Sequence, residues 1–230
     1  MQAYEWILFD ADETLFHFDA FAGLKLMLSE CGVDFSPADY AEFQSINRPL
    51  WVAYQNGEIT AQDIKDRRFA VWSLRLGLET SYLNSLFLKA IAEISGPLPG
   101  AASLLNGLSG KAKLGIITNG FMDLQDIRLE KAGLSDIFHV LIISEIVGVA
   151  KPNPKIFEHA LENMGYPARS RVLMVGDNLE SDILGANNIG FDTCWLNPQL
   201  SPSFDSIEPT FQVASLSELE EMLRPHYFLV

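Results

Sequence analysis

Short apolar runs that alternate with amphipathic segments restrict the fold of this chain more than any other feature. Runs rich in Ile, Leu and Val, bounded by polar residues, are typical of parallel strands buried on both faces. We expect strands near residues 6–9, 113–118, 139–144, 171–176 and 191–196. We expect helices near residues 101–109, 122–132, 154–164, 181–189 and 215–224. This alternation predicts an α/β fold, in which a doubly wound parallel sheet carries helices on both faces.

A long segment of different pattern interrupts the alternation after the first strand. Between residues 17 and 96 the apolar positions follow helical spacing. The helices predicted there cover 18–28, 37–54, 60–76 and 80–94. We therefore expect a Rossmann-like core built from residues 1–16 plus 97–230, with a four-helix bundle inserted at 17–96 as a cap domain.

Asp10 and Asp12 stand directly after the first predicted strand. Two carboxylates one residue apart repel each other and raise one pKa unless a cation intervenes. Such a pair suits a nucleophile beside a general acid/base, with Mg²⁺ absorbing the charge. A lone pair of this kind is more often an ordinary acidic turn, so the interpretation depends on the rest of the chain.

Polar residues also accompany three later elements: the end of the second predicted strand, the start of a helix after the third, and the end of the fourth. They are Thr118, Asn119, Gly120, Lys151, Asp177, Ser181 and Asp182. Ligands of such sheets bind beyond the carboxyl ends of the strands, where the strand order reverses. If the first strand lies between the second and the fourth, Asp10, Thr118 and Asp177 converge on one crevice.

The pair Asp10 and Asp12 and the three later groups of polar residues form four motifs along the chain. In this order they resemble the signature motifs of the haloacid dehalogenase-like hydrolase superfamily, over essentially the whole chain. The resemblance implies hydrolysis through an aspartyl-phosphate, with Asp10 as nucleophile and Asp12 as acid and then base. Thr118 and the backbone of Asn119 and Gly120 would hold the phosphoryl oxygens. Lys151 would pair with the nucleophile and with the transferring group.

The resemblance also implies a site for Mg²⁺, in which Mn²⁺ could take its place. Mg²⁺ takes oxygen ligands, so Asp10, the main-chain carbonyl of Asp12 and Asp177 suit it. Ser181 and Asp182 would lie behind these ligands, or Asp182 would reach the ion through water.

The residues around the first motif bear on the substrate. Superfamily dehalogenases lack an acid two positions after the nucleophile, so Asp12 favours phosphate transfer. Glu13 replaces the glycine of most phosphatases and makes the motif similar to a branch of bacterial pyrimidine 5′-nucleotidases, which prefer dUMP, dTMP and UMP. Asn47 and Trp51 share a helix face and could read and stack on a base. An aromatic residue at helical spacing more often packs a core.

Two alternative functions stay open: a phosphatase of sugar phosphates or other small phosphometabolites, and a catalytically silent binding protein on the same scaffold. Phosphonate-cleaving relatives need a lysine from the cap, and Lys25 falls roughly where that residue could sit. Arg67 and Arg68 are interpreted as a solvated helix face rather than as ligands of phosphate.

The net charge and the composition of the chain limit the classes of molecule that it can bind. The net charge of −14 disfavours long nucleic acid, which needs a basic face, but a metal and a lysine can still accommodate a nucleoside monophosphate or another small phosphorylated metabolite. No apolar stretch approaches the roughly 20 residues that cross a bilayer, so we expect no membrane partner. Cys31 and Cys194 are expected to be free thiols, and the chain to be cytoplasmic.

Overall fold

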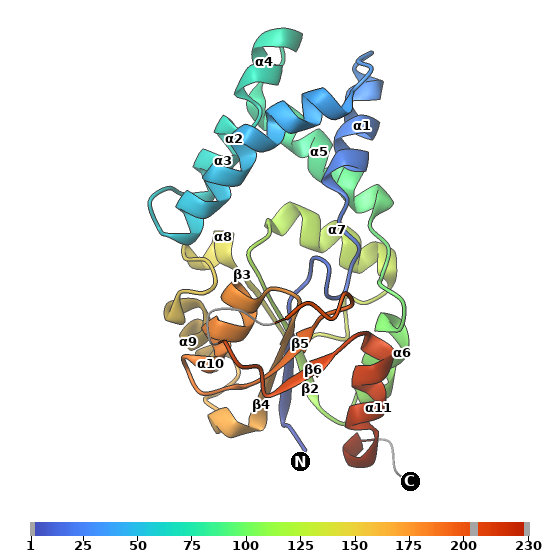
Figure 1. Ribbon diagram of the computed structural model, residues 1–230, viewed down its shortest axis with the longest axis vertical. Helices are drawn as coiled ribbons and strands as arrows, with labels where there is room; N and C mark the ends of the chain where they lie inside the picture. Colours follow the sequence, from blue (N-terminus) through green and yellow to red (C-terminus); the bar gives the residue numbers. More distant parts are fainter. Residues whose placement is uncertain (1–2, 203–206, 228–230) are drawn as a thin grey trace.

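The computed structural model describes residues 3–202 and 207–227. Within these ranges the sheet has six strands, all parallel, in the order β3-β2-β1-β4-β5-β6. The strands are β1 (Trp6–Phe9), β2 (Lys113–Thr118), β3 (Val140–Ile143), β4 (Val172–Gly176), β5 (Asp192–Leu196) and β6 (Phe211–Val213). The first strand is therefore central, with β2 and β4 on either side, and the predicted doubly wound sheet is confirmed (Figure 1).

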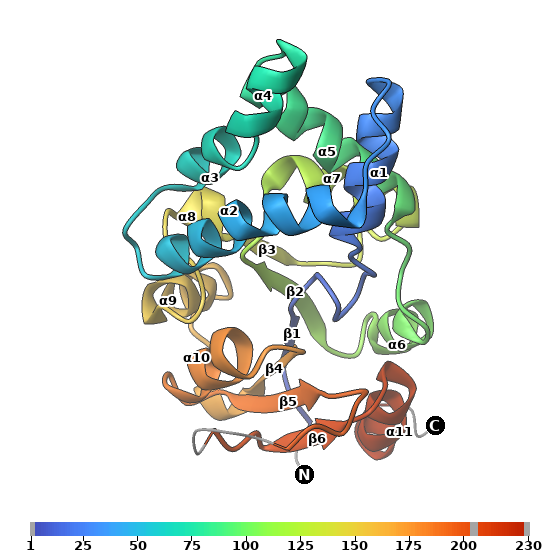
Figure 2. The same cartoon turned by 45° about the horizontal axis from the view of Figure 1, so that its top comes forward.

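Helices cover both faces of this sheet. Every residue of β1 is therefore buried, and its side chains alternate between two apolar layers. Ile7 and Phe9 pack in the layer with α6 and α11, and Trp6 and Leu8 pack in the layer with α9 and α10 (Figure 2). The helices of the core are α6 (Ala101–Leu108), α7 (Met122–Ala132), α8 (Ser144–Val147), α9 (Pro154–Asn163), α10 (Gly185–Asn187) and α11 (Leu216–Tyr227). A short 3₁₀ turn (Arg169–Arg171) precedes β4, and a π-helical turn (Leu179–Leu184) follows it.

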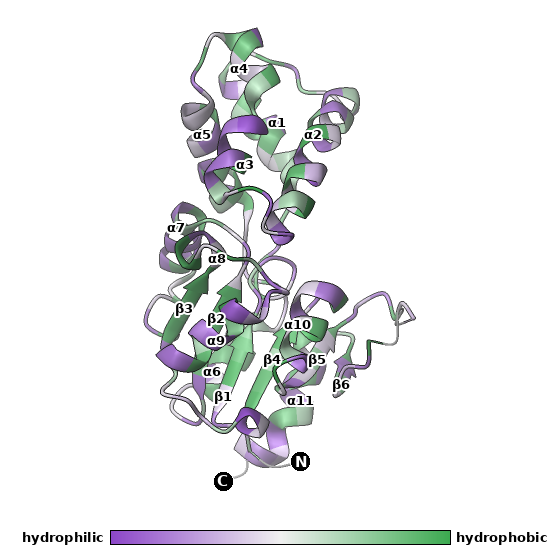
Figure 3. Ribbon diagram, turned by 90° about the vertical axis from the view of Figure 1, so that its left-hand side faces the viewer, coloured by the Kyte–Doolittle hydropathy of each residue, from purple (hydrophilic) through white to green (hydrophobic). Residues whose placement is uncertain are grey.

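The inserted segment forms a helical lobe over the carboxyl ends of the strands (Figure 3). Its apolar cluster continues into the core domain through Phe121, Leu124 and Ala150. Its helices are α1 (Ala20–Glu30), α2 (Pro37–Gln55), α3 (Ala61–Arg67), α4 (Ala70–Leu76) and α5 (Thr80–Ile94). Ser36 and Thr60 start α2 and α3 through reciprocal side-chain to backbone hydrogen bonds with the aspartate three residues later.

The sequence predicts four helices in the cap, and the described part of the insertion contains five. The segment predicted as one helix over 60–76 divides, because Phe69 leaves helical geometry at φ −105° and ψ 6°. Arg68 and Phe69 are both buried, so the break turns two successive side chains into the interior.

Two segments of connecting chain join the cap to the core and lie side by side. The main-chain NH of His17 donates to the carbonyl of Gly96 at 3.0 Å, and that of Leu98 donates to the carbonyl of Leu15 at 2.8 Å. The cap is thus tethered to the core by a narrow two-stranded connection.

The remaining differences from expectation are local. The edge strand β6 and the short helix α8 were not predicted, because three or four residues are too few to show a period. The helix expected at 181–189 opens instead as the π-helical turn. In the described ranges, no helix is both long and apolar enough to span a membrane.

Candidate active site

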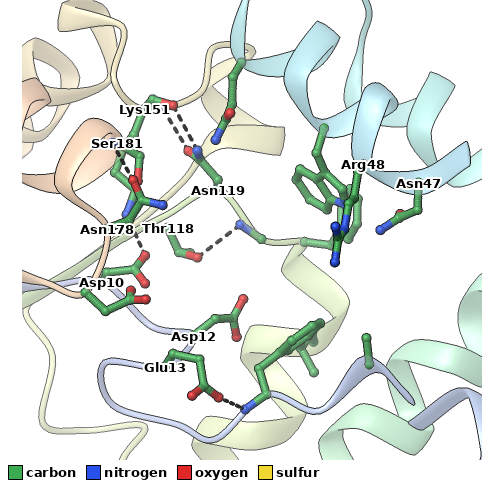
Figure 4. A pocket seen from close by; sticks show the side chains of 18 of the residues that line it. Asp10, Asp12, Glu13, Asn47, Arg48, Thr118, Asn119, Lys151, Asn178 and Ser181 are labelled. Atoms are coloured by element: carbon green, nitrogen blue, oxygen red, sulfur yellow. Dashed lines mark hydrogen bonds and ion pairs between the residues drawn. The ribbon is translucent and has the colours of Figure 1, made fainter. Parts of the chain in front are cut away.

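A cavity of about 420 Å³ lies between the strand ends and the cap. All the site residues that the sequence suggested line it: Asp10, Asp12, Asn47, Trp51, Thr118, Asn119, Gly120, Lys151, Asp177, Ser181 and Asp182. Figure 4 shows Asp10 and Asp12 on the core side, and Asn47 and Arg48 on the cap helix opposite. Phe43 and Phe87 of the cap add apolar wall.

Lys151 is the central cation on the core side of the cavity, and its side chain is 1% exposed. Its Nζ donates to Asp10 Oδ1 at 2.5 Å, to Asp182 Oδ1 at 2.6 Å and to the carbonyl of Ile117 at 2.8 Å. Burial alone would lower the pKa of this ammonium, but the two carboxylates raise it above its ordinary value. Lys151 is therefore held protonated beside Asp10.

Asn119 holds the main chain of that lysine in place. Its Oδ1 accepts from the Lys151 NH at 2.7 Å, and its Nδ2 donates to the Lys151 carbonyl at 3.0 Å (Figure 4). The side chain predicted to bind substrate thus bonds to the protein through both of its polar atoms, which leaves the Asn119 backbone for a ligand.

The π-helical turn after β4 brings Asp182 under the site. The carbonyl of Asn178 accepts from the NH groups of both Asp182 and Ile183, at 3.0 and 3.3 Å, and the widened turn points the Asp182 carboxylate at Lys151. A Cβ on Gly176 would lie 2.3 Å from Asp182 Oδ2, so only glycine permits this approach. This packing explains why glycine is the last residue of β4.

Three carboxylates, those of Asp10, Asp177 and Asp182, offer oxygens within 4.8 Å of one another. Burial, opposed by Lys151 and reinforced by neighbouring carboxylates, raises the pKa of Asp10 to about 7. Burial and repulsion by Asp10 and Asp182 raise the pKa of Asp177 to about 8. With all three ionised, one lysine leaves two negative charges uncompensated, and an all-oxygen donor set of that charge suits a divalent cation such as Mg²⁺.

Arg128, which the sequence analysis did not single out, is the partner of Asp12. Its side chain is fully buried, and its Nη1 donates to Asp12 Oδ1. Its Nε donates to Gln125 Oε1 at 2.9 Å, and its guanidinium lies 4.7 Å from the centroid of the Phe16 ring. No local signal marks this arginine, because it lies inside the amphipathic helix α7. It fixes the direction of the Asp12 carboxylate.

The turn after β2 is held by a hydrogen bond within itself. The Gly120 NH donates to Thr118 Oγ1 at 3.0 Å (Figure 4). A Cβ on Gly120 would lie 2.6 Å from Gln125 Nε2, so α7 approaches this turn closely. Thr118 is 1% exposed and lines the cavity beside Asp10.

Glu13 occupies a backbone position that favours glycine. Its φ of 56° lies in the left-handed region. Its Oε1 accepts from the Phe18 NH at 2.5 Å, which ties the first motif to the chain entering the cap. This hydrogen bond offsets part of the strain of a non-glycine residue.

On the cap side, Trp51 both packs and lines the cavity. Its ring lies 5.3 Å from that of Phe121 and 5.9 Å from that of Tyr54, centroid to centroid. The Oδ1 of Asn47 is buried without a partner in the described part of the chain. Lys25, considered as the lysine of a phosphonate-cleaving site, is exposed and does not line this cavity.

The two adjacent arginines of the cap have opposite environments. Arg67 is exposed and pairs with Asp63 at 3.0 Å, as expected for a solvated helix face. The same expectation is wrong for Arg68, which is 3% exposed and lines the cavity, because it lies on the same helix face as the buried Ala61 and Ile64. Burial lowers the pKa of the Arg68 guanidinium to about 9.

Comparisons with known proteins agree with this geometry. The sequence model of the haloacid dehalogenase-like hydrolases matches residues 4–190. The chain is 56% identical over 223 residues to the pyrimidine 5′-nucleotidase YjjG of Escherichia coli, covering 97% of this chain and 99% of that protein. It is 32% identical over 225 residues to the pyrimidine 5′-nucleotidase PynA of Streptococcus pneumoniae, covering 96% and 95%.

A solved structure is similar over the same extent. The crystal structure of the HAD-hydrolase YfnB from Bacillus subtilis bound to magnesium, which reveals interdomain movement in that protein, matches with a TM-score of 0.80 at 30% identity. The match covers 96% of this chain and 99% of that one. The four motifs, the strand order and these similarities lead to one conclusion: the chain belongs to the haloacid dehalogenase-like hydrolase family.

Proposed function

We propose that this hydrolase is a Mg²⁺-dependent 5′-nucleotidase that prefers pyrimidine and deoxyribonucleotides such as dUMP, dTMP and UMP. One observation carries the proposal: a single cavity joins the Asp10–Lys151 pair to the aromatic side chains of the cap. A phosphoryl group at the strand ends then leaves the base among the cap residues. The names of two similar proteins, both pyrimidine 5′-nucleotidases, support the same substrate class.

In the first step, an Asp10 carboxylate oxygen attacks phosphorus and the ester bond to the nucleoside oxygen breaks. Asp12 gives its proton to the departing oxygen, so that a neutral alcohol leaves. Lys151 sits 2.5 Å from Asp10 Oδ1 and neutralises charge on the nucleophile and the phosphoryl group. The product is an aspartyl-phosphate on Asp10.

In the second step, Asp12 takes a proton from water, and the water oxygen attacks phosphorus. The bond between phosphorus and Asp10 breaks, which releases inorganic phosphate and restores the carboxylate. The Thr118 hydroxyl and the main-chain NH of Asn119 hold the phosphoryl oxygens throughout, and the Gly120 NH, which donates to Thr118 Oγ1, orients that hydroxyl. The contact with Arg128 keeps Asp12 in one orientation for both proton transfers.

The metal site of this proposal consists of Asp10, Asp177 and the main-chain carbonyl of Asp12. Asp182 suits a supporting role better than a ligand role, because its oxygens already accept from Lys151, Ser181 Oγ and the Asn178 NH. When bound, Mg²⁺ supplies charge neutralisation and orientation for the phosphoryl group.

We also propose that the cap opens and closes over the site. The narrow connection through His17 and Gly96 allows such a hinge, and closure excludes water from the aspartyl-phosphate. The interdomain movement of the similar YfnB structure supports this part of the proposal.

A panel of phosphate esters tests the proposed function. Phosphate release is measured with dUMP, dTMP, purine nucleotides, hexose phosphates and p-nitrophenyl phosphate, in Mg²⁺ and in EDTA. We expect kcat/KM for dUMP to exceed that for hexose phosphates by about 10- to 100-fold, the range of base stacking, and activity to vanish in EDTA.

Two outcomes contradict the proposal. Faster turnover of a hexose phosphate than of every nucleotide favours the sugar-phosphatase alternative. Undiminished turnover after EDTA treatment and removal of traces of metal overturns the metal requirement.

A further inference from the structure

We propose that Arg68 is the residue of the cap that recognises the base, by donating a hydrogen bond to a carbonyl oxygen of the pyrimidine ring. This inference rests on the proposed nucleotidase function. It names the residue that would determine specificity, and it follows from the environment of one side chain.

Arg68 is a buried cation without a counter-charge. In residues 3–202 and 207–227, no carboxylate forms an ion pair with it. The other buried arginine of the site, Arg128, pairs with Asp12, and the neighbouring Arg67 pairs with Asp63 in solvent. A buried charge without a partner is costly, and an apolar side chain would fill such a place more favourably. The arrangement is therefore best explained by a ligand.

The guanidinium is held in a defined orientation. Its Nε donates to Asn84 Oδ1 at 3.0 Å, and its Nη2 donates to the same oxygen. Rings of Phe69, Phe87 and Phe121 surround it, with centroids 5.4, 5.0 and 5.1 Å from the guanidinium carbon. Asn84 is itself 4% exposed, so the support is rigid. No hydrogen-bond acceptor within the described chain engages Nη1, which can donate to a ligand.

Its position fits the base of a bound nucleotide. Phe121 directly follows Gly120 of the phosphate-holding turn, so Arg68 stacks on the residue next to that turn. Arg68 and Asp10 line the same cavity, one from the cap and one from the core. A ligand with its phosphoryl group at Asp10 therefore extends its other end toward Arg68.

The chemistry of the surroundings selects a carbonyl-bearing ring. Arginine only donates hydrogen bonds, so it suits the carbonyl oxygens of uracil and thymine and not an exocyclic amino group. The orphaned Oδ1 of Asn47, in the same cavity, is an acceptor that suits a ring NH. Phe87 and Phe121 provide apolar surface for the faces of a planar ring.

The test compares Arg68→Met with the matched variant Arg67→Met, which removes the adjacent, exposed arginine. Each is measured with dUMP and with 2-deoxyribose 5-phosphate, in which a hydroxyl group replaces the base. We expect Arg68→Met to lower kcat/KM for dUMP by about 10- to 100-fold, mainly through KM, and that for the sugar phosphate by at most about threefold. Arg67→Met should leave both values near those of the wild type.

Stability provides a second readout. Arg68→Met should not lower Tm, because methionine fits among the phenylalanine rings and removes an uncompensated charge. Arg68→Lys, which keeps the charge and loses the planar fork, should lose an intermediate part of the dUMP activity. Asn84→Leu, which releases the guanidinium, should act in the same direction through KM for dUMP.

The outcomes separate this inference from the function on which it rests. Equal loss on both substrates, or no loss on dUMP, overturns the role of Arg68. If Arg68→Met does not fold, the same criteria apply to Arg68→Lys and Asn84→Leu. A wild-type protein that hydrolyses 2-deoxyribose 5-phosphate as fast as dUMP overturns the nucleotidase proposal before any variant is measured.

Discussion

The core side and the cap side of the cavity treat buried charge in opposite ways. On the core side, Lys151 lies against Asp10 and Asp182, and Arg128 lies against Asp12. On the cap side, Arg68 lies among phenylalanine rings with an amide as its hydrogen-bond partner. Catalytic groups gain from charged partners that are already in place, because these partners need not reorganise during the reaction. Groups that recognise a substrate can instead be left for the substrate to complete.

The largest effect is expected on the core side, from Asp10→Asn. An amide cannot attack phosphorus, so turnover of dUMP should fall by at least about 10⁴-fold. The fold should persist, because Lys151 keeps its bond to Asp182 and one buried carboxylate is removed. Steady-state phosphate release and a Tm measurement check both points. Asp126→Asn, an exposed position on α7, should retain the wild-type rate. Steady-state turnover by purified Asp10→Asn, free of wild-type protein, contradicts the nucleophile assignment.

A second core variant separates proton transfer from metal binding. Asp12→Asn should lower kcat by about 10²- to 10⁴-fold, since it removes the acid and base of both steps. The Mg²⁺ concentration for half-maximal activity should change little, because the proposed ligand is the main-chain carbonyl. Weaker Mg²⁺ binding with unchanged kcat at saturating metal would reverse this division of roles.

The contrast between the two sides also explains what the sequence could predict. Asp10, Thr118 and Asp177 each follow a buried run, and a parallel sheet brings such strand ends together whatever the details of packing. Local pattern therefore sufficed to predict the strands and the polar residues at their ends. The meeting of these residues was predicted on the condition that the first strand lies between the second and the fourth, which the strand order fulfils. The remaining site residues came from the resemblance to the family.

Tertiary packing decides the rest. Arg67 and Arg68 are adjacent and chemically identical, but Arg68 lies four residues after the buried Ile64 and is buried, whereas Arg67 is exposed. Arg128 pairs with Asp12 across 116 residues of chain, and neither residue shows it locally. The π-helical turn that carries Asp182 depends on the space left by Gly176. The pairing of Arg128 with Asp12 and the π-helical turn depend on which side chains meet, and the local sequence does not show this. The burial of Arg68, in contrast, follows the helical spacing of the buried Ala61 and Ile64.

The ion pair between Arg128 and Asp12 can also be broken by replacing the arginine. Arg128→Met should lower kcat by about tenfold or more, less than Asp12→Asn, because the carboxylate remains but is no longer oriented. A double-mutant cycle provides the control: on the Asp12→Asn background the same change should add little further loss of kcat. Additive losses would mean that Arg128 acts on the reaction independently of Asp12.

On the cap side the effects should be smaller and should depend on the substrate. Trp51→Ala should raise KM for dUMP by about tenfold, the order of one stacking contact, and affect p-nitrophenyl phosphate far less. Michaelis constants for both esters check this. Equal losses on the two substrates would show that the contact of Trp51 with Phe121 only packs the cap.

The smallest effect is expected where the two sides meet. The Tyr54 hydroxyl of the cap donates to Ser144 Oγ of the core at 2.8 Å, and both residues are buried. Tyr54→Phe removes one neutral hydrogen bond, worth about 1 kcal/mol, so KM should rise by about two- to fivefold. Closure serves every substrate, so dUMP and p-nitrophenyl phosphate should be affected alike.

A matched variant isolates that contact. Tyr82→Phe removes the hydroxyl of an exposed tyrosine of the cap helix α5 that does not line the cavity, so it should leave KM unchanged. If Tyr54→Phe instead raises KM for dUMP alone, the hydroxyl contributes to base recognition and not to closure of the cap. If neither ester is affected, the remaining contacts, such as that of Lys65 with Glu145 at 2.5 Å, suffice to hold the closed form.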